Sequence, residues 1–167
     1  MAGKQRVLIG VPGFNGITQP AQEAMIALAF WCGKHMPEYD FAFEVVTKRE
    51  QFRARNLLIS TAIGAKCDWL LMLDDDMLPP PDLVQRLLAH QKPVVGALYW
   101  QRGGAYHPII MREFNLGGDF RKYQFVSATD PIIAEKPGLH QVDVIGGGCM
   151  LFDVTVFAEM QKPYFWW

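Results

Sequence analysis

Short, continuously apolar segments alternate with segments of helical periodicity through the first hundred residues of the chain. Strands that are apolar at every position are typical of a parallel sheet that is buried on both faces. The sequence therefore predicts an α/β fold with a mainly parallel central sheet and helices on both faces. The predicted strands are residues 6–11, 41–46, 69–73 and 94–98, and the predicted helices are residues 18–36, 51–65 and 82–90.

The second half of the chain is less regular. From Gln101 onward, glycines, aromatic residues and short strand-like pieces replace the alternation, as in residues 109–111 and 141–145. A strand over 149–152 and a helix from Asp153 are predicted to follow a glycine turn. Because there is no linker or internal repeat, we predict a single domain over residues 1–167, in two parts divided near residue 100.

Composition excludes several classes of protein. Sixteen basic and seventeen acidic residues give a net charge of −1, which argues against a nucleic-acid partner. The apolar run over residues 24–32 is shorter than the roughly 20 residues of a membrane span, so we expect no transmembrane segment and a cytoplasmic location. The three cysteines form no CxxC pair, and we expect all three to be buried, reduced packing residues.

The strongest chemical signal is the run Asp74-Asp75-Asp76, which directly follows the predicted strand over 69–73. Ligands of open α/β sheets bind beyond the carboxyl ends of the strands. Adjacent carboxylates repel one another unless a cation compensates them, and a hard divalent ion with oxygen ligands would do so. The sequence predicts a metal site here. The alternative is a solvated acidic turn, with Asp82 capping the next helix.

Two further segments contain groups suited to a nucleotide. Arg53 and Arg55 precede Asn56 at the start of a predicted helix, and arginine makes planar, bidentate contacts with phosphate or with a base edge. The turn over residues 12–16 (PGFNG) follows the first strand, and its small residues allow close approach of a ligand while Phe14 could stack on a ring. The alternatives are surface arginines and a plain strand-to-helix turn.

A third segment, Gly146-Gly147-Gly148, lacks the spacing of a dinucleotide-binding fingerprint. It is either a simple bend or a loop that faces substrate. The four histidines show no ligand spacing, so we expect them to be structural or surface residues. His107 is the exception to consider, because it lies in an aromatic, glycine-rich stretch over residues 99–108 that also contains Trp100.

Three blocks together resemble the family 2-type glycosyltransferases, which have the Rossmann-like glycosyltransferase A (GT-A) fold. They are VLIGVPGFNG near the start, RARNLLISTAIGAKCDWLLMLDDDMLPPPDL in the middle and VIGGGCMLFDVTVF near the end. The middle block is the most specific, because it holds an Arg-Asn helix, a buried strand and a DxD signature followed by prolines. The resemblance covers nearly the whole chain in the family's order.

The resemblance implies a role for each matched residue. Asp74 and Asp76 would be the metal residues of the DxD signature, with Asp76 the direct ligand of Mn²⁺ or Mg²⁺, and Asp74 and Asp75 would lie near the ribose. Residues 1–100 would bind the nucleotide sugar, and residues 101–167 would form the acceptor side. The other implied nucleotide-binding residues are Pro12, Gly13, Phe14, Asn15, Arg55 and Asn56. The residues implied for the sugar and acceptor side are Gly146, Gly147 and Gly148, to which we add Trp100 and His107 as candidates from the aromatic, glycine-rich stretch.

The end of the chain departs from the family's pattern. Family members continue past an aromatic segment into an acidic pair that supplies the catalytic base, whereas this chain ends at Trp167. We therefore expect the base to lie in a segment beyond Trp167, with Asp143 as the candidate within the chain. An aromatic end over residues 164–167 would leave an apolar patch, so self-association through it is a further hypothesis.

The resulting prediction is a hexosyltransferase that uses a nucleoside diphosphate sugar, with a UDP-sugar as the first choice, a divalent metal and an unidentified acceptor. The resemblance implies inversion at the anomeric carbon. The alternatives are a nucleotidyltransferase acting on sugar phosphates and a non-catalytic nucleotide-binding module. A nucleotidyltransferase usually has a basic, glycine-rich loop after its first strand, and the loop over residues 12–16 contains no Lys or Arg.

Overall fold

The computed structural model of the chain divides into two compact units. The first comprises Met1–Val95 and Gly147–Trp167, and the second comprises Gly96–Gly146. The structure describes residues 3–101, 107–115, 121–134 and 138–166. The expected division of one domain into a donor part and an acceptor part stays a prediction.

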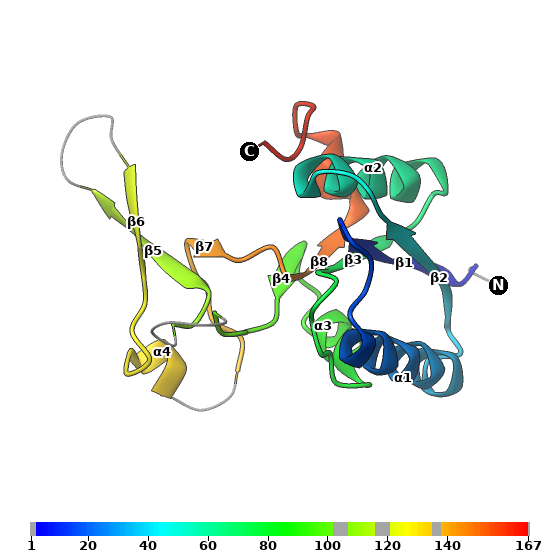
Figure 1. Cartoon of the computed structure of the whole chain (residues 1–167), viewed down its shortest axis with the longest axis horizontal. Coiled ribbons are helices and arrows are strands. Elements are labelled where there is room, and N and C mark those ends of the chain that lie inside the picture. Colours follow the sequence, from blue (N-terminus) through cyan, green and yellow to red (C-terminus); the bar gives the residue numbers. More distant parts are fainter. Residues whose placement is uncertain (1–2, 102–106, 116–120, 135–137, 167) are drawn as a thin grey trace. The chain divides into compact units, whose positions relative to one another are not determined.

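The first unit is built on a five-stranded sheet with the order β2-β1-β3-β8-β4. Strand β1 pairs in parallel with both β2 and β3, whereas β8 runs antiparallel to β3. The sheet is seen edge-on at the centre of the unit in Figure 1. The strands are β1 (Gln5–Pro12), β2 (Tyr39–Val46), β3 (Trp69–Leu73), β4 (Val94–Gly96) and β8 (Cys149–Asp153).

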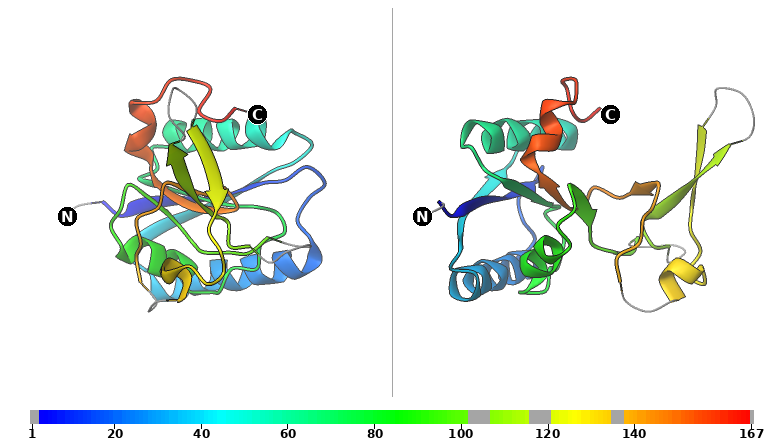
Figure 2. Two further views of the ribbon diagram at one scale, coloured as in Figure 1. Left: turned by 90° about the vertical axis from the view of Figure 1, so that its left-hand side faces the viewer. Right: turned by 180° about the vertical axis from the view of Figure 1, so that it is seen from behind.

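Helices cover both faces of this sheet. Helices α1 (Gln19–His35) and α3 (Leu83–Ala89) lie on one face, and α2 (Gln51–Gly64) lies on the other beside the 3₁₀ helix η1 (Val154–Ala158) (Figures 1 and 2). The prediction of an α/β, Rossmann-like GT-A fold with a mainly parallel sheet and helices on both faces is confirmed.

The core follows from the continuously apolar strands. In β3, Leu70 and Met72 pack in one cluster with Leu58 and Ile59 of α2. Side chains alternate across a strand, so Leu71 contributes to the opposite layer, and it is also fully buried. All three cysteines are free and buried, as expected. Burial raises the pKa of the Cys32 thiol to about 11, which keeps the thiol neutral at physiological pH.

The second unit contains a three-stranded antiparallel sheet with the order β6-β5-β7. Its strands and helix are β5 (Ile110–Asn115), β6 (Arg121–Phe125), α4 (Pro131–Ala134) and β7 (Val144–Ile145). The sequence indicated a short strand at 109–111 but did not predict β6 or α4. Antiparallel pairing with β6 extends β5 well beyond the three apolar residues that signalled it.

Three predicted elements differ from those observed. The strand expected over 141–145 contains only Val144–Ile145, and the one expected over 94–98 ends at Gly96. The helix predicted from Asp153 is the short 3₁₀ helix η1, and the Asp153 carboxylate caps its start by accepting hydrogen bonds from the backbone and hydroxyl of Thr155. Asp82 precedes α3 without a capping hydrogen bond and instead pairs with Arg86.

The close packing of β1 against α2 gives a first testable prediction. A Cβ atom at Gly10 would lie 2.8 Å from Cδ2 of Leu58, which is fully buried. Gly10→Ala should therefore destabilise the protein by about 1–3 kcal/mol through overpacking. Gly33→Ala in α1 is the matched control: no heavy atom lies within 4 Å of its added Cβ, and a gain of about 0.5–1 kcal/mol is expected. Urea unfolding of both variants measures the difference, and equal stabilities would contradict this packing.

Candidate functional site

The polar residues singled out in the first unit gather at one edge of its sheet. Parallel β1 and β3 end at Pro12 and Leu73, so the loop after β1 and the acidic run after β3 emerge at the same edge. Antiparallel β8 begins there too, because Cys149 pairs with Leu73. The site therefore combines three chain segments that are far apart in the sequence.

The centre of the site is an ion pair between Arg55 and Asp74. Nη2 of Arg55 lies 2.8 Å from Oδ1 of Asp74, and the two side chains are 14% and 22% exposed. Gln51, one turn earlier in α2, donates from Nε2 to the same carboxylate oxygen at 3.1 Å. Residues four apart lie on the same face of a helix, so α2 presents both donors to the acidic turn.

The glycine turn before β8 closes over this ion pair. Nη2 of Arg55 also donates to the carbonyl oxygen of Gly147 at 3.2 Å, and the backbone N–H of Asp74 donates to the carbonyl of Gly148 at 2.9 Å. A Cβ atom at Gly147 would lie 3.0 Å from three atoms of the Arg55 guanidinium. Glycine is needed at position 147 because the backbone approaches the guanidinium so closely.

The loop after β1 lies against the second carboxylate of the run. A Cβ atom at Gly13 would lie 2.8 Å from Oδ2 of Asp75. The backbone carbonyl of Asp75 accepts a hydrogen bond from the N–H of Thr18 at 3.1 Å, which ties the start of α1 to the acidic turn. Thr18 makes no side-chain cap with its helix. Phe14, which is 62% exposed, lies next to Gly13 in this loop.

The acidic run adopts a turn rather than continuing β3, which ends at Leu73. Alternation along a strand therefore does not decide where the carboxylates point. Asp74 faces Arg55 of α2, and Asp75 faces Gly13 of the β1 loop. These two side chains thus serve different segments of the site.

The electrostatics of the turn show an excess of negative charge. Burial raises the pKa of the Asp74 carboxyl group, which Arg55 and Gln51 counteract and Asp76 reinforces. Burial and the Asp76 charge also raise the pKa of Asp75, against hydrogen bonds from backbone groups. Asp76 therefore acts on both neighbours as a like charge.

These residues fit a divalent cation in part. Within the described ranges, no group of three His, Cys, Asp or Glu side chains converges on one point. A Mg²⁺-type ion in a nucleotide site, however, uses one or two carboxylates and takes its other ligands from phosphates and water. The mutual repulsion centred on Asp76 is what such an ion would relieve.

Asn56 is placed differently from the other nucleotide-binding candidates. Its side-chain amide faces the C-terminal segment, where it contacts the backbone of Tyr164 and Phe165. The guanidinium carbon of Arg55 lies 5.5 Å from the centre of the Phe165 ring. Trp166 is 74% exposed, and Trp167 lies outside the described residues, so self-association through this end stays a prediction.

The other acceptor-side candidates belong to the second unit. Trp100 forms an isolated bridge with Pro108, and the ring of His107 stacks on Phe125 with centroids 6.1 Å apart. The N–H of Gly146 donates to Ile109. Residues 102–106 of the aromatic, glycine-rich stretch lie outside the described residues.

Asp143, the candidate base, also lies in the second unit. Its Oδ2 atom accepts a hydrogen bond from the backbone N–H of Glu113 in β5 at 2.9 Å. Its role as a base stays untested.

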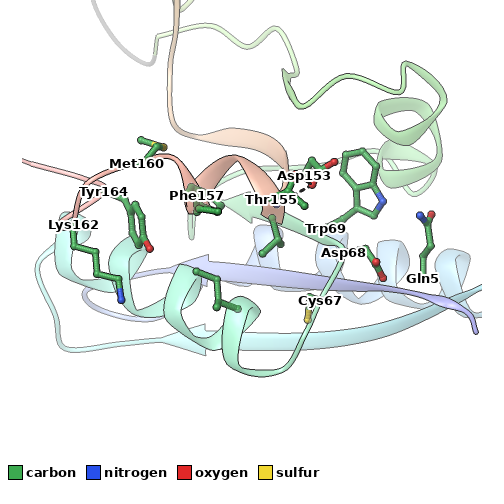
Figure 3. Close-up of a pocket in the computed structure, with 13 residues that line it drawn as sticks. Gln5, Cys67, Asp68, Trp69, Asp153, Thr155, Phe157, Met160, Lys162 and Tyr164 are labelled. Atoms are coloured by element: carbon green, nitrogen blue, oxygen red, sulfur yellow. Dashed lines mark hydrogen bonds between the residues drawn. The ribbon is translucent and has the colours of Figure 1, made fainter.

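A separate pocket of about 590 Å³ lies at the other end of β3, and none of the residues predicted to bind nucleotide, metal, sugar or acceptor lines it. Figure 3 shows Trp69 and Gln5 toward one end of this pocket and Lys162 and Tyr164 toward the other. The pocket marks where β3 begins and β8 ends, opposite the edge that carries the acidic turn.

Sequence reasoning missed two contributors to the site. Gln51 could have been found, because it lies four residues before Arg55 and thus on the same helical face. Phe165 could not, since 110 positions separate it from Arg55 and no local pattern links them. Its aromatic character alone indicated only burial.

Comparisons with known proteins support the fold more strongly than they support membership of any family. The profile of the Anp1 family matches residues 40–118, which is less than half of the chain. No curated protein matches the chain. The crystal structure of A197 from STIV, a viral protein, aligns with a TM-score of 0.59 at 13% sequence identity, covering 97% of this chain and 72% of that chain.

The expected membership of the family 2-type glycosyltransferases is wrong. The family profile that matches is that of Anp1, and the solved structure that aligns is not clearly a family 2 enzyme. The blocks that suggested family 2 are a buried strand, an acidic turn and an arginine helix that meet at one sheet edge of this chain. Among the described residues, no helix is both long and apolar enough to cross a membrane.

The central ion pair gives a prediction on stability. Asp74→Asn should lower the free energy of unfolding by about 1–3 kcal/mol, because it leaves the half-buried Arg55 guanidinium without its charged acceptor. Asp82→Asn is the matched control, since Asp82 pairs with the exposed Arg86, and a cost of about 0–1 kcal/mol is expected. Thermal and urea unfolding provide the comparison. Equal losses of stability in the two variants would mean that the Arg55–Asp74 pair stabilises the protein no more than the exposed Asp82–Arg86 pair.

Proposed function

We propose that the chain is a glycosyltransferase-like enzyme that binds a nucleoside diphosphate sugar and a divalent cation at the edge of the sheet where β1 and β3 end. The observation that carries this proposal is the convergence of the acidic turn, Arg55 and the Gly13 loop at that edge. Such edges are where open α/β sheets bind nucleotides. The Anp1 match and the A197 likeness point the same way.

In this proposal the loop after β1 receives the nucleobase, with Phe14 as the exposed ring available for stacking. Gly13 and Gly147 let the backbone approach Asp75 and Arg55, because a Cβ atom at these positions would lie 2.8 Å from Asp75 and 3.0 Å from Arg55. Asp76 and Asp74 would hold Mn²⁺ or Mg²⁺. When bound, the cation would stabilise the negative charge on the leaving diphosphate.

The proposal leaves the identity of the donor sugar to be determined by experiment. The Anp1 family is of the mannosyltransferase type, so a nucleoside diphosphate mannose belongs in the test panel beside the UDP-sugars. The expectation of inversion depended on the family 2 resemblance and has no part in the proposal.

The first functional test is a donor panel. The chain is incubated with UDP- and GDP-sugars and Mn²⁺, and release of nucleoside diphosphate is measured against a chelator control. We expect release from at least one donor with metal and none above background with chelator. Release of pyrophosphate from a nucleoside triphosphate and a sugar phosphate would instead indicate a nucleotidyltransferase. Tight nucleotide binding without any turnover would indicate a non-catalytic module.

The second functional test concerns the cation. Calorimetry should show that UDP or GDP binds more tightly with Mn²⁺ than with a chelator. Asp76→Asn should reduce the metal-dependent gain at least about tenfold, since even outer partners of a metal site cost about 10–100-fold when removed. Asp82→Asn, the same change six residues later in an exposed ion pair, should leave the gain intact. A metal-dependent gain that survives in Asp76→Asn would overturn the assignment of Asp76.

A further inference from the structure

We propose that Asn56 is a positioning residue: it fixes Phe165, and Phe165 in turn holds the Arg55 guanidinium in place beside Asp74. The inference rests on the proposed nucleotide site, which it deepens. It assigns Asn56 a function different from the nucleotide contact that the sequence suggested.

The side-chain amide of Asn56 has no hydrogen-bonding capacity left for a ligand. Nδ2 donates to the carbonyl of Phe52 at 2.8 Å and to that of Phe165 at 3.0 Å. Oδ1 accepts from the N–H of Tyr164 at 2.7 Å and from that of Phe165 at 3.2 Å. A primary amide has two N–H donors and two acceptor lone pairs, so all four are used. A nucleotide contact would require breaking one of these bonds.

Three of these four bonds fix the backbone of the C-terminal segment against α2. Two of the three bonds to this segment involve Phe165, which holds its backbone on both sides. Tyr164 and Phe165 also pack as half-buried residues against the core cluster of α2 and η1. The position of the Phe165 ring is therefore set jointly by Asn56 and by the core.

The Phe165 ring lies beside a guanidinium that is not fully hydrogen-bonded. Among the described residues the buried Nε atom of Arg55 has no hydrogen-bond partner, and the ring centre lies 5.5 Å from the guanidinium carbon. An arginine over an aromatic face is attracted by the ring's quadrupole. Arg55 is thus fixed by Asp74 and Gly147 through Nη2 and by Phe165 on its face. Loss of the ring would free the guanidinium to rotate away from the site.

A double-mutant cycle on nucleotide affinity tests whether Asn56 affects binding through Arg55 or by contacting the nucleotide itself. With GDP or UDP and Mn²⁺, Arg55→Ala should weaken binding about 10- to 100-fold, and Asn56→Ala should weaken it several-fold. If Asn56 acts through Arg55, the double variant should bind like Arg55→Ala to within about twofold. If Asn56 contacts the nucleotide itself, the two losses multiply and the proposal fails.

The role of Phe165 is tested by a conservative pair. Phe165→Leu keeps an apolar side chain against the core but removes the ring face, and should weaken binding as Asn56→Ala does. Phe165→Tyr keeps the ring and should bind the nucleotide with wild-type affinity. Ser60→Ala is the neutral control: Ser60 is exposed, lies one turn after Asn56 and bonds only to the backbone carbonyl of that residue. Equal affinities of Phe165→Leu and Phe165→Tyr would overturn the proposal.

A measurement without nucleotide keeps this inference distinct from the proposed function. The NMR signal of the Arg55 Nε–H group reports the nearby ring, so it should shift in Asn56→Ala and in Phe165→Leu but not in Ser60→Ala. Circular dichroism checks that each variant is folded, and Asn56→Asp replaces Asn56→Ala if the latter unfolds. An unchanged Arg55 signal would overturn the inference. If the Arg55 signal shifts in these variants as expected but the wild-type chain binds no nucleotide, the proposed function is overturned and this inference is not.

Discussion

The parallel pairing of β1 with β3 is the constraint on which the site depends. Because both strands run the same way, their carboxyl ends deliver the Gly13 loop and the acidic turn to one edge, where Gly13 touches Asp75. The pairing requires α2 to lie close over β1, which the missing side chain of Gly10 allows. That closeness in turn brings Arg55 of α2 within reach of Asp74.

Continuous apolar runs made the central strands predictable, because a strand that is buried on both faces is apolar at every position. Strand direction was less accessible. Nothing in residues 149–153 signals that β8 runs antiparallel to β3, since direction is set by the route of the chain through the second unit. Strand β6 was missed for a related reason: its sequence, RKYQF, is polar and depends on pairing with β5 rather than on burial.

The same distinction, between local sequence features and long-range contacts, applies to the site. Asp74, Arg55 and Gly147 could be singled out because charge in an apolar setting and repeated glycine are visible locally. Their mutual contacts were not visible, and neither was the contact of Asn56 with Phe165, because contacts between residues far apart in the chain leave no trace in one sequence. The family resemblance misled for this reason: it matched the local segments, whereas a family is defined by more than a fold and an acidic turn.

Charge balance limits how the acidic turn can work. Three adjacent carboxylates lie at the turn, Arg55 pairs with Asp74, and burial raises the pKa of the Asp74 and Asp75 carboxyl groups. One divalent cation would offset the repulsion among these carboxylates, and a bound diphosphate would then add further negative charge. Arg55 pairs with Asp74 through Nη2, so its other N–H groups could serve a phosphate, whereas the ion pair competes with a cation for the Asp74 carboxylate. The position of Arg55, and of Phe165 beside it, therefore bears on whether the acidic turn can accept cation and diphosphate together.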